Sequence, residues 1–325
     1  MENTINKVLT QSSMGAVQAC AFRYNLKYNE GLAPLDKAVH LHIGSVFHLG
    51  VECFRERQSI GRVEDFRELE QALDEMGSDA ACVTRAMLIA YFEKYQDDSW
   101  EFVSVEKKWE TDWGGVVSGF SMQGVVDALV ADGHDGVLLV ETKTTARLDG
   151  SYLEGLWSRR QTLVYDMAMR SHGYNVSGIV YDIAQKPSIR RLKATPEAKR
   201  KYKKNGELIA RHRAVDESDE EYMVRLNAWY EDHPEAFHRE PVLHTQSQLD
   251  DIRRDVIGVM GLINHYAEQD FWPRSLTSCY AYNRACEFVP YCQSGRNPLV
   301  RESHYRVDEI HPELKEKNDD NTDTE

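Results

Sequence analysis

Two apolar strands, each interrupted by a carboxylate, constrain the fold of this 325-residue chain more than any other feature. The segment GVVDALVADGHDGVLLVETK places turn residues between two apolar runs, which predicts an antiparallel hairpin of strands at 116–130 and Val137–Lys143. Asp127 and Glu141 lie almost symmetrically about the turn, so we expect them roughly 5 Å apart on neighbouring strands. Glu141 and Lys143 are two residues apart and project from the same face.

This arrangement of side chains predicts a metal site. Two close carboxylates repel each other unless a cation lies between them, and hard oxygen ligands suit Mg²⁺ or Mn²⁺. Such an ion lowers the pKa of bound water and neutralises charge on a scissile phosphate, while a neighbouring lysine orients or deprotonates the water. The alternative is an ordinary polar-face pair. Against that alternative, unpaired carboxylates are costly within apolar runs.

Periodicity predicts the elements around the hairpin. Apolar residues recur at helical spacing over 40–57, 83–95 and 152–171. Alternation predicts a strand over 101–109, and an apolar run predicts another over 176–184. The core order is therefore helix, three-strand meander, helix, strand, which is an α/β fold.

This order and its carboxylates resemble the PD-(D/E)XK nuclease superfamily, in particular its RecB-like branch. Asp127 matches the motif aspartate, and Glu141 with Lys143 matches the (D/E)XK element. Glu106 lies where the branch often carries an acidic residue. The resemblance implies a restriction-endonuclease-like core that cleaves DNA with Mg²⁺ or Mn²⁺, for which the Thr142 carbonyl is a further ligand.

Two helices carry residues that fit the same branch. His48, in GSVFHLG, lies where these nucleases place a histidine near the metal; a lone helical histidine is otherwise more often structural. Gln161 and Tyr165, in RRQTLVYDMAM, match a Gln-x-x-x-Tyr signature and lie one helical turn apart. The resemblance implies that they contact the DNA strand, and we expect Arg159 and Arg160 to do so as well. The alternative places the Gln and Tyr at the edge of the core.

One strongly basic run interrupts an acidic chain. The formal net charge is −14, which argues against a surface that grips nucleic acid everywhere. Residues 189–204 nevertheless contain eight basic and one acidic side chain. The run is either a solvated loop or a phosphate contact, and Arg190, Arg191 and Lys193 are its candidate DNA-binding residues.

Four of the six cysteines are candidate metal ligands. Cys279, Cys286 and Cys292 lie in CYAYNRACEFVPYC, too close together for three buried apolar residues, and Cys20 is the candidate fourth thiolate. Zinc is the alternative to iron-sulfur, but structural zinc sites usually use two short Cys pairs, which this chain lacks. Two further cysteines lie in apolar helical contexts, where a packed thiol is expected: Cys53 and Cys82.

The one-plus-three cysteine layout around the nuclease motifs resembles the iron-sulfur RecB-like nucleases. That group includes AddB of bacterial break-repair complexes, the CRISPR adaptation nuclease and stand-alone phage exonucleases. It implies a [4Fe-4S] cluster that staples the C-terminal end of the chain to its N-terminal end. The size and cysteine spacing resemble the phage group most.

We expect one composite nuclease domain over residues 1–305 and an acidic, disordered tail over 306–325. Within the domain we expect a core at about 40–185, a basic insert and helical region at about 186–270, and the cysteine segment 279–292 joined to Cys20. From Asp308 to Glu325 the tail has eight acidic and two basic residues.

The predicted function is a metal-dependent DNA exonuclease acting in phage or prophage recombination or DNA end processing. Its substrate would be DNA ends, and a single-strand annealing protein or a helicase is the candidate partner, since the chain has no GxxxxGK[ST] loop. Alternatives are a non-cleaving DNA-end-binding or assembly subunit, a CRISPR adaptation nuclease, and an iron-sulfur redox protein. No long apolar run or secretory layout is present, which predicts a cytoplasmic protein without a membrane partner.

Overall fold

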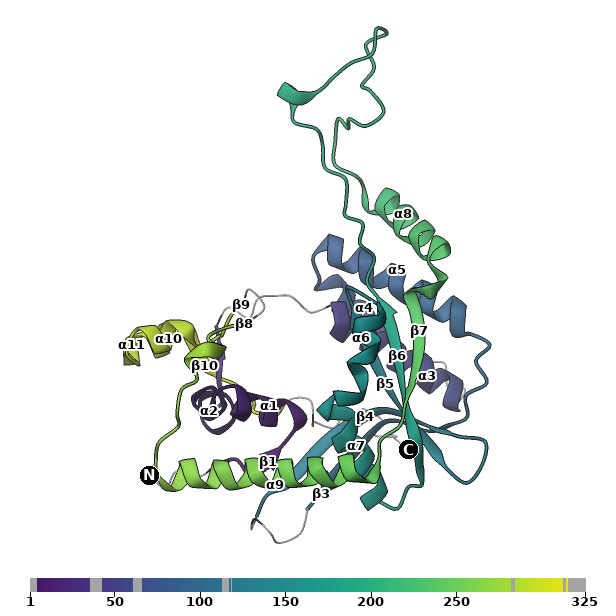
Figure 1. The fold of residues 1–325 in the computed structure, drawn as a ribbon. Helices are drawn as coiled ribbons and strands as arrows, with labels where there is room; N and C mark the ends of the chain where they lie inside the picture. Colours follow the sequence, from purple (N-terminus) through teal and green to yellow (C-terminus); the bar gives the residue numbers. More distant parts are fainter. Residues whose placement is uncertain are drawn as a thin grey trace, which may run out of the picture.

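A mixed sheet organises the fold in the computed structural model (Figure 1). The structure describes residues 5–35, 43–60, 66–112, 117, 119–281, 284–311 and 314. The strands of the sheet are β1 (Val8–Leu9), β3 (Phe102–Thr111), β4 (Ser121–Ala131), β5 (Val137–Thr145), β6 (Val176–Gln185) and β7 (Phe237–Val242).

The predicted meander is confirmed. β3 pairs antiparallel with β4, and β4 pairs antiparallel with β5. β6 then pairs parallel with β5, and β7 pairs antiparallel with β6. The mixed α/β architecture fits a restriction-endonuclease-like fold. β1 and β7 were not anticipated, because a two-residue strand carries no periodic signal and FHREPV lacks apolar alternation.

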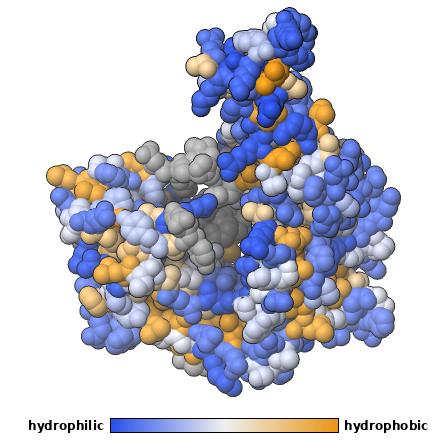
Figure 2. Space-filling view, turned by 45° about the horizontal axis from the view of Figure 1, so that its top comes forward, coloured by the Kyte–Doolittle hydropathy of each residue, from blue (hydrophilic) through white to orange (hydrophobic). Residues whose placement is uncertain are grey.

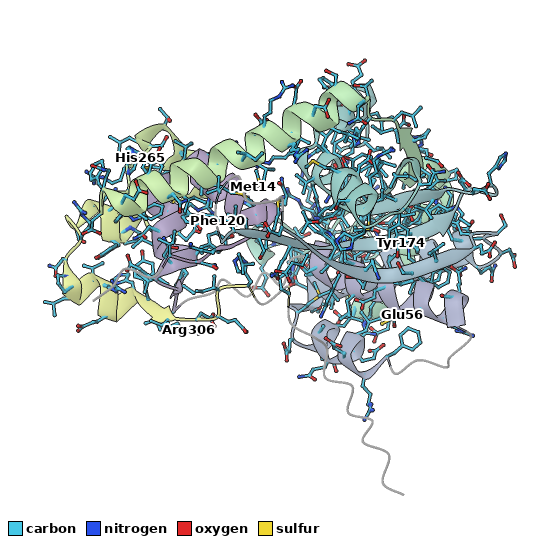
Figure 3. All side chains as sticks on the ribbon, turned by 90° about the horizontal axis from the view of Figure 1, so that it is seen from below. Met14, Glu56, Phe120, Tyr174, His265 and Arg306 are labelled. Atoms are coloured by element: carbon cyan, nitrogen blue, oxygen red, sulfur yellow. The ribbon has the colours of Figure 1, made fainter. Side chains whose placement is uncertain are left out.

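Helices cover both faces of the sheet. On one face α1, α7 and α9 share a core with β4 and β6, and Figure 3 shows Met14 and Phe120 beside the long helix α9. On the other face α3, α4, α5 and α8 form a second core. The bounds are α1 Gln11–Ala19, α3 Ile43–Ile60, α4 Arg67–Asp74, α5 Ser78–Tyr95, α7 Arg160–Ser171, α8 Asp219–Asp232 and α9 Gln246–Glu268.

The predicted helix over 152–171 is wrong in its first half. The chain forms α6 (Gly150–Glu154) and a 3₁₀ turn (Leu156–Ser158) before α7 begins. Arg159 is extended, with ψ 108°, and caps neither helix with its side chain. The break is fixed by a tertiary contact, because the Tyr181 hydroxyl of β6 donates to the Leu156 carbonyl at 3.2 Å. Sequence periodicity does not report such a contact.

Other predicted boundaries shift by a few residues. The helix predicted from residue 40 is described from Ile43, and residues 40–42 lie outside the described residues. The strand predicted from residue 116 begins at Ser121, with 116 and 118 outside them. The helix predicted over 83–95 is the C-terminal part of α5.

The two ends of the chain meet in a small unit that we call the cysteine lobe, residues 20–35 and 272–311. β2 (Leu32–Pro34) pairs antiparallel with β10 (Tyr305–Val307). β10 includes residue 306, the first residue of the predicted tail, so the tail does not begin there. Residues 312–313 and 315–325 of that tail lie outside the described residues. Its other elements are α2 (Ala21–Tyr24), a π-helical turn (Asn25–Asn29), β8 (Tyr280–Ala281), β9 (Arg284–Ala285), α10 (Val289–Gln293) and α11 (Pro298–His304).

Figure 1 shows α9 running from the sheet to the cysteine lobe. Its apolar stripe packs on the core through Ile252, Val256 and Ile263. In the described part of the chain, no helix is both long and apolar enough to cross a membrane.

Candidate active site

The site lies where one edge of β4 is left open between two partners. Ala128 of β4 pairs with β5, whereas Met122 pairs with β1, and β3 follows the opposite edge at both points. β1 and β5 therefore share one edge of β4 with a gap between them. We call this gap the fork. Asp127 lies at the fork beside the last residue paired to β5.

The predicted carboxylates meet at the fork. The ladder register places Asp127 opposite Glu141, one step beyond the pair formed by Ala128 and Val140. Asp127 Oδ2 accepts a hydrogen bond of 2.7 Å from the backbone N–H of Thr142. This bond fixes the orientation of the Asp127 side chain across the gap.

Glu141 is a buried carboxylate in an unfavourable environment. Its side chain is 2% exposed, and Oε2 has no hydrogen-bond partner. Burial, reinforced by the negative charge of Asp127, raises its pKa to about 8, and Lys143 only partly offsets this. A cation beside Oε2 would satisfy the unpaired oxygen and favour the ionised form.

Lys143 starts a chain of polar contacts that runs away from the carboxylates. Its Nζ forms an ion pair with Glu141 Oε1 and donates to Gln161 Oε1 at 2.8 Å. Gln161 Nε2 in turn donates to the Tyr165 hydroxyl at 3.1 Å. The predicted one-turn spacing of the glutamine and tyrosine on α7 thus brings both to the lysine. Burial raises the pKa of Tyr165, so the phenol is neutral.

His48 of α3 approaches the fork from the other face of the sheet. Its Nδ1 lies 3.6 Å from Asp127 Oδ2. Burial lowers the pKa of His48, the charge of Asp127 opposes that shift, and Lys143 adds to it. A neutral imidazole keeps a lone pair available for a metal ion.

A buried ion pair supports the site from behind. Arg55 of α3 donates to Asp182 Oδ2 at 2.9 Å, and both side chains are essentially unexposed. The Tyr91 hydroxyl donates to the same oxygen at 2.5 Å. Asp182 pairs with Thr142 in the ladder between β6 and β5, so this network holds the strand that carries Glu141.

A pocket of about 270 Å³ opens beside the carboxylates. It is lined by Asp127, Gln161 and Tyr165 together with residues that sequence reasoning missed: Thr10, Gln11, Ser12, Gln123, Gly124 and Val125. Gln123 and Val125 alternate with Asp127 along β4, a signal that could have been read from the sequence. The three residues that follow β1 could not have been predicted from the sequence, because only the pairing of β1 with β4 brings them to the pocket.

Glu106 lines the same pocket in a strained backbone conformation. It lies between Val105 and Lys107, which pair with Ala128 and Val126, so it faces Asp127 across β3 and β4. Its φ is 47°, a left-handed conformation that is uncommon for a residue with a Cβ. Strain of this kind is often retained at functional sites.

The predicted DNA-binding arginines separate into two places. Arg160 Nε donates to the pocket residue Gln11 at 2.9 Å, and the exposed Arg159 stacks over the Tyr152 ring at 5.4 Å. Arg160 therefore reaches the edge of the pocket, and Arg159 precedes it in the chain. Arg191 instead forms ion pairs of 2.6 Å with Asp79 of α5 and Asp219 of α8.

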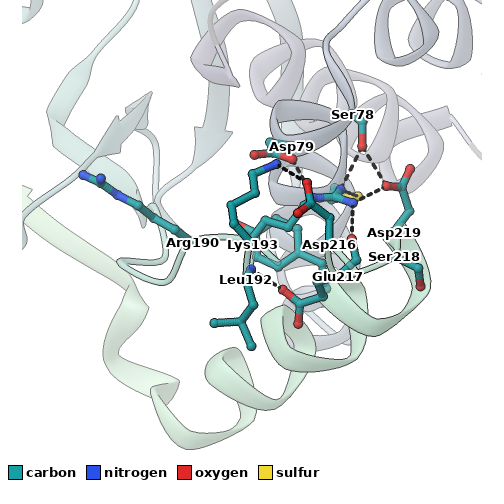
Figure 4. Close-up of polar contacts among 12 residues, drawn as sticks. Ser78, Asp79, Arg190, Leu192, Lys193, Asp216, Glu217, Ser218 and Asp219 are labelled. Carbon is teal, nitrogen blue, oxygen red and sulfur yellow. Dashed lines mark hydrogen bonds and ion pairs between the residues drawn. The ribbon is translucent and has the colours of Figure 1, made fainter. Parts of the chain in front are cut away.

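Arg191 is therefore engaged by carboxylates of the protein, which favours a structural role, and its contact with DNA stays a prediction. Its side chain is 8% exposed, and burial among carboxylates satisfies its charge internally. Lys193 pairs with Asp216 at 3.3 Å on the surface. Arg190 points away from this cluster (Figure 4).

The four predicted thiolates line one small pocket. Cys20, Cys279, Cys286 and Cys292 all contribute to it, walled by Phe22, Phe288 and Val289. Burial raises the pKa of the Cys292 thiol, and the neighbouring Cys20 and Cys279 contribute to that shift. A backbone N–H, that of Ser275, donates to the Cys20 sulfur at 3.5 Å. None of the six cysteines, all of which are described, is in a disulfide, and Cys82 is buried as expected.

Neither place has the ligands of a single ion fully assembled. Among the residues described, no group of three or more His, Cys, Asp or Glu side chains is arranged to hold a metal ion. Mg²⁺ needs only one or two carboxylates from the protein, and the fork offers two, Asp127 and Glu141.

Comparison with known proteins identifies the family. The PD-(D/E)XK nuclease superfamily matches the chain over residues 8–293. A comparison with curated proteins gives no match. Because the family match covers most of the chain, the protein belongs to the PD-(D/E)XK nuclease superfamily. The family indicates a metal-dependent nuclease that acts on DNA.

Proposed function

We propose that this protein is a metal-dependent DNA exonuclease whose reaction takes place at the fork. One observation carries the proposal: Glu141 Oε2 is buried without a partner, beside Asp127 and Lys143. A buried carboxylate of this kind is costly unless a cation compensates it. The order Asp, Glu-x-Lys on β4 and β5 is that of the family motif.

Asp127, Glu141 and the Thr142 carbonyl would hold Mg²⁺ or Mn²⁺, with His48 as a further ligand. When bound, the ion polarises the phosphate and lowers the pKa of a water molecule. Lys143 would position or activate the attacking water, and hydrolysis would form a bond from its oxygen to phosphorus as the bond to the leaving sugar oxygen breaks. Gln161 holds Lys143 in place through its 2.8 Å contact.

Residues at the pocket mouth would guide the DNA strand. Gln161 and Tyr165 line the pocket, and Arg160 contacts the lining residue Gln11. Arg159 is exposed and offers its guanidinium to a phosphate. The Gln-x-x-x-Tyr resemblance to the RecB-like branch supports an exonuclease over other nucleases. A role in phage or prophage recombination is part of the proposal, and a neighbouring gene for a single-strand annealing protein would support it.

We propose that the four pocket cysteines bind a [4Fe-4S] cluster. Their convergence from two ends of the chain, and the arginines near them, suit a cluster of thiolates. Anaerobically purified protein should contain about four iron atoms per chain and absorb visible light. Cys292→Ser should lose both, while Cys53→Ser should keep both. A wild-type protein with zinc in place of iron would contradict the cluster.

The nuclease is tested by cleavage of end-labelled single- and double-stranded DNA with Mg²⁺, Mn²⁺ or EDTA. We expect loss of label only with a metal ion, and a decrease on the order of 10²- to 10³-fold for Asp127→Ala and Lys143→Ala. Lys107→Ala, on β3 and two strands away, is the matched control for Lys143. Cleavage that survives Asp127→Ala would contradict the site, and DNA binding without cleavage by the wild type would favour the non-cleaving DNA-end-binding subunit.

A further inference from the structure

A long basic arm leaves the sheet beside the fork. We define the arm as residues 186–218, between β6 and α8. It starts where Lys186 N–H donates to the Thr145 carbonyl at 2.7 Å, two residues beyond Lys143 on β5. Figure 1 shows the arm projecting away from the body, and Figure 2 shows its largely hydrophilic surface standing clear of it.

The two limbs of the arm are tied together along their length. Thr195 N–H donates to the Arg213 carbonyl at 2.9 Å, and Arg200 bonds the Thr195 and Ala214 carbonyls. At the tip, Tyr202 and Leu208 form an antiparallel bridge that closes a tight hairpin. The arm is therefore a defined projection with paired limbs.

The root of the arm is fixed to the body by buried charges (Figure 4). Arg191 bridges Asp79 and Asp219, and Ser78 accepts from it at 2.8 Å. Glu217 is 2% exposed, accepts from Leu192 N–H at 2.7 Å and pairs with Arg225. Two cations at the root, Arg191 and Lys193, are thus paired with carboxylates of the protein.

The tip has the opposite character. Residues 199–213 contain seven basic side chains and one acidic side chain in a chain of net charge −14. Throughout 199–216 no residue is buried, so the tip encloses no core. In the described structure the side chains of Lys199, Lys201, Lys204 and Arg211 are exposed and make no ion pair or hydrogen bond.

We infer that the tip of the arm binds the phosphate backbone of duplex DNA on its way to the fork. The unpaired cations on the tip repel one another, and no buried core offsets this cost. Bound phosphates would neutralise the cations and remove the repulsion. The arm and Lys143 share one end of the sheet, so a duplex whose end enters the fork passes beside the arm. This inference rests on the proposed nuclease function and moves the phosphate-binding role from Arg191 at the root to the tip.

The chemistry of the tip favours a duplex over a single strand. Single strands are bound on successive exposed aromatic rings between cations. The tip offers one such ring, that of Tyr202, which is 58% exposed. Backbone contacts by lysines carry no sequence information, so binding should be independent of sequence.

The test measures binding of a labelled duplex, about three helical turns long, by the full-length protein in EDTA across several salt concentrations. The arm variant is K199A/K201A/K204A. The matched control, R57A/R253A/R254A, removes three exposed charges from α3 and α9. Thermal unfolding of both variants should match the wild type, since none of the six side chains is buried.

We expect the arm variant to bind duplex about 10-fold more weakly or worse at low salt. The slope of log affinity against log salt should become shallower by about 2 to 3, roughly 0.9 for each phosphate that the protein no longer neutralises. The control should stay within about twofold of the wild type, because its charges lie away from the arm. Equal binding by the two variants, or a decrease confined to single-stranded DNA, would overturn the inference. Binding is measured in EDTA and so does not depend on cleavage. A wild type that binds duplex through the arm but does not cleave it when Mg²⁺ or Mn²⁺ is added would contradict only the nuclease proposal.

Discussion

The fork and the cysteine lobe differ in how the protein accommodates their reactive side chains. At the fork, Glu141 is buried with an oxygen that no protein group satisfies. In the lobe, the four thiols line a pocket whose walls are already held by Phe22, Phe288 and Tyr305. Strand pairing of β2 with β10 and the 3.0 Å ion pair of Arg23 with Glu287 close the lobe independently of the thiols.

This difference predicts where each group matters. At the fork the register of β4 and β5 places two carboxylates side by side. We therefore expect the reaction to need a cation there, and we expect the fold to form without it. In the lobe, strand pairing and aromatic packing join the ends of the chain, so the proposed cluster would add a further link between them. Cys20 and Cys286 lie far apart in the sequence, yet both pack against the same buried aromatic cluster.

The largest effect should come from Glu141→Gln, which removes a proposed metal ligand at the fork and keeps the shape of the side chain. The amide keeps the volume but removes the charge that would hold the cation, so cleavage should fall on the order of 10²- to 10³-fold. The free energy of unfolding should stay the same or increase, because the amide has no ionised form that burial would penalise at any pH. End-label cleavage and urea unfolding measure the two effects. A destabilised variant would mean that Glu141 serves the fold.

A smaller effect should come from Tyr305→Ala, which breaks the lobe. Tyr305 is 5% exposed, stacks on Phe288 and donates to the Glu287 carbonyl at 2.9 Å. Its removal should destabilise the lobe by about 3 kcal/mol and expose β10 to protease, while the fork keeps its structure. Tyr280→Ala is the control, since that ring is 64% exposed and should change stability by less than about 0.5 kcal/mol. Equal protease sensitivity of the two variants would contradict the role of Tyr305 in holding the lobe together.

The smallest effect, taken per pH unit, sharpens the comparison through the pH dependence of stability. In metal-free protein, burial and then Asp127 raise the pKa of Glu141 from 4.5 to about 8. Between these values the native state holds a proton that the unfolded state has released, so stability should fall as pH rises, by at most about 1.4 kcal/mol per pH unit. Thermal unfolding from about pH 5 to about pH 8 measures this slope. Glu141→Gln should flatten it and Mn²⁺ should offset it; a slope unchanged in the variant would refute its origin in Glu141.

Much of the site could be predicted from the sequence, because its residues lie close together along the chain. Asp127, Glu141 and Lys143 follow from alternation about one turn, and Gln161 with Tyr165 follows from helical spacing. The structure brings all five together, although their roles remain proposals. The break before α7 was missed, since it depends on Tyr181, a residue on another strand.

The sequence by itself determined which residues share a face: the period of two on strands and the one-turn spacing on a helix are fixed by backbone geometry. Only the tertiary structure decided which edges meet. β1 inserts beside β4 to form the fork, Glu106 takes a left-handed conformation opposite Asp127, and Asp79 with Asp219 neutralises Arg191. Each of these depends on partners far away in the chain. Their positions follow from the packing of the whole sheet and its helices, which local periodicity does not encode.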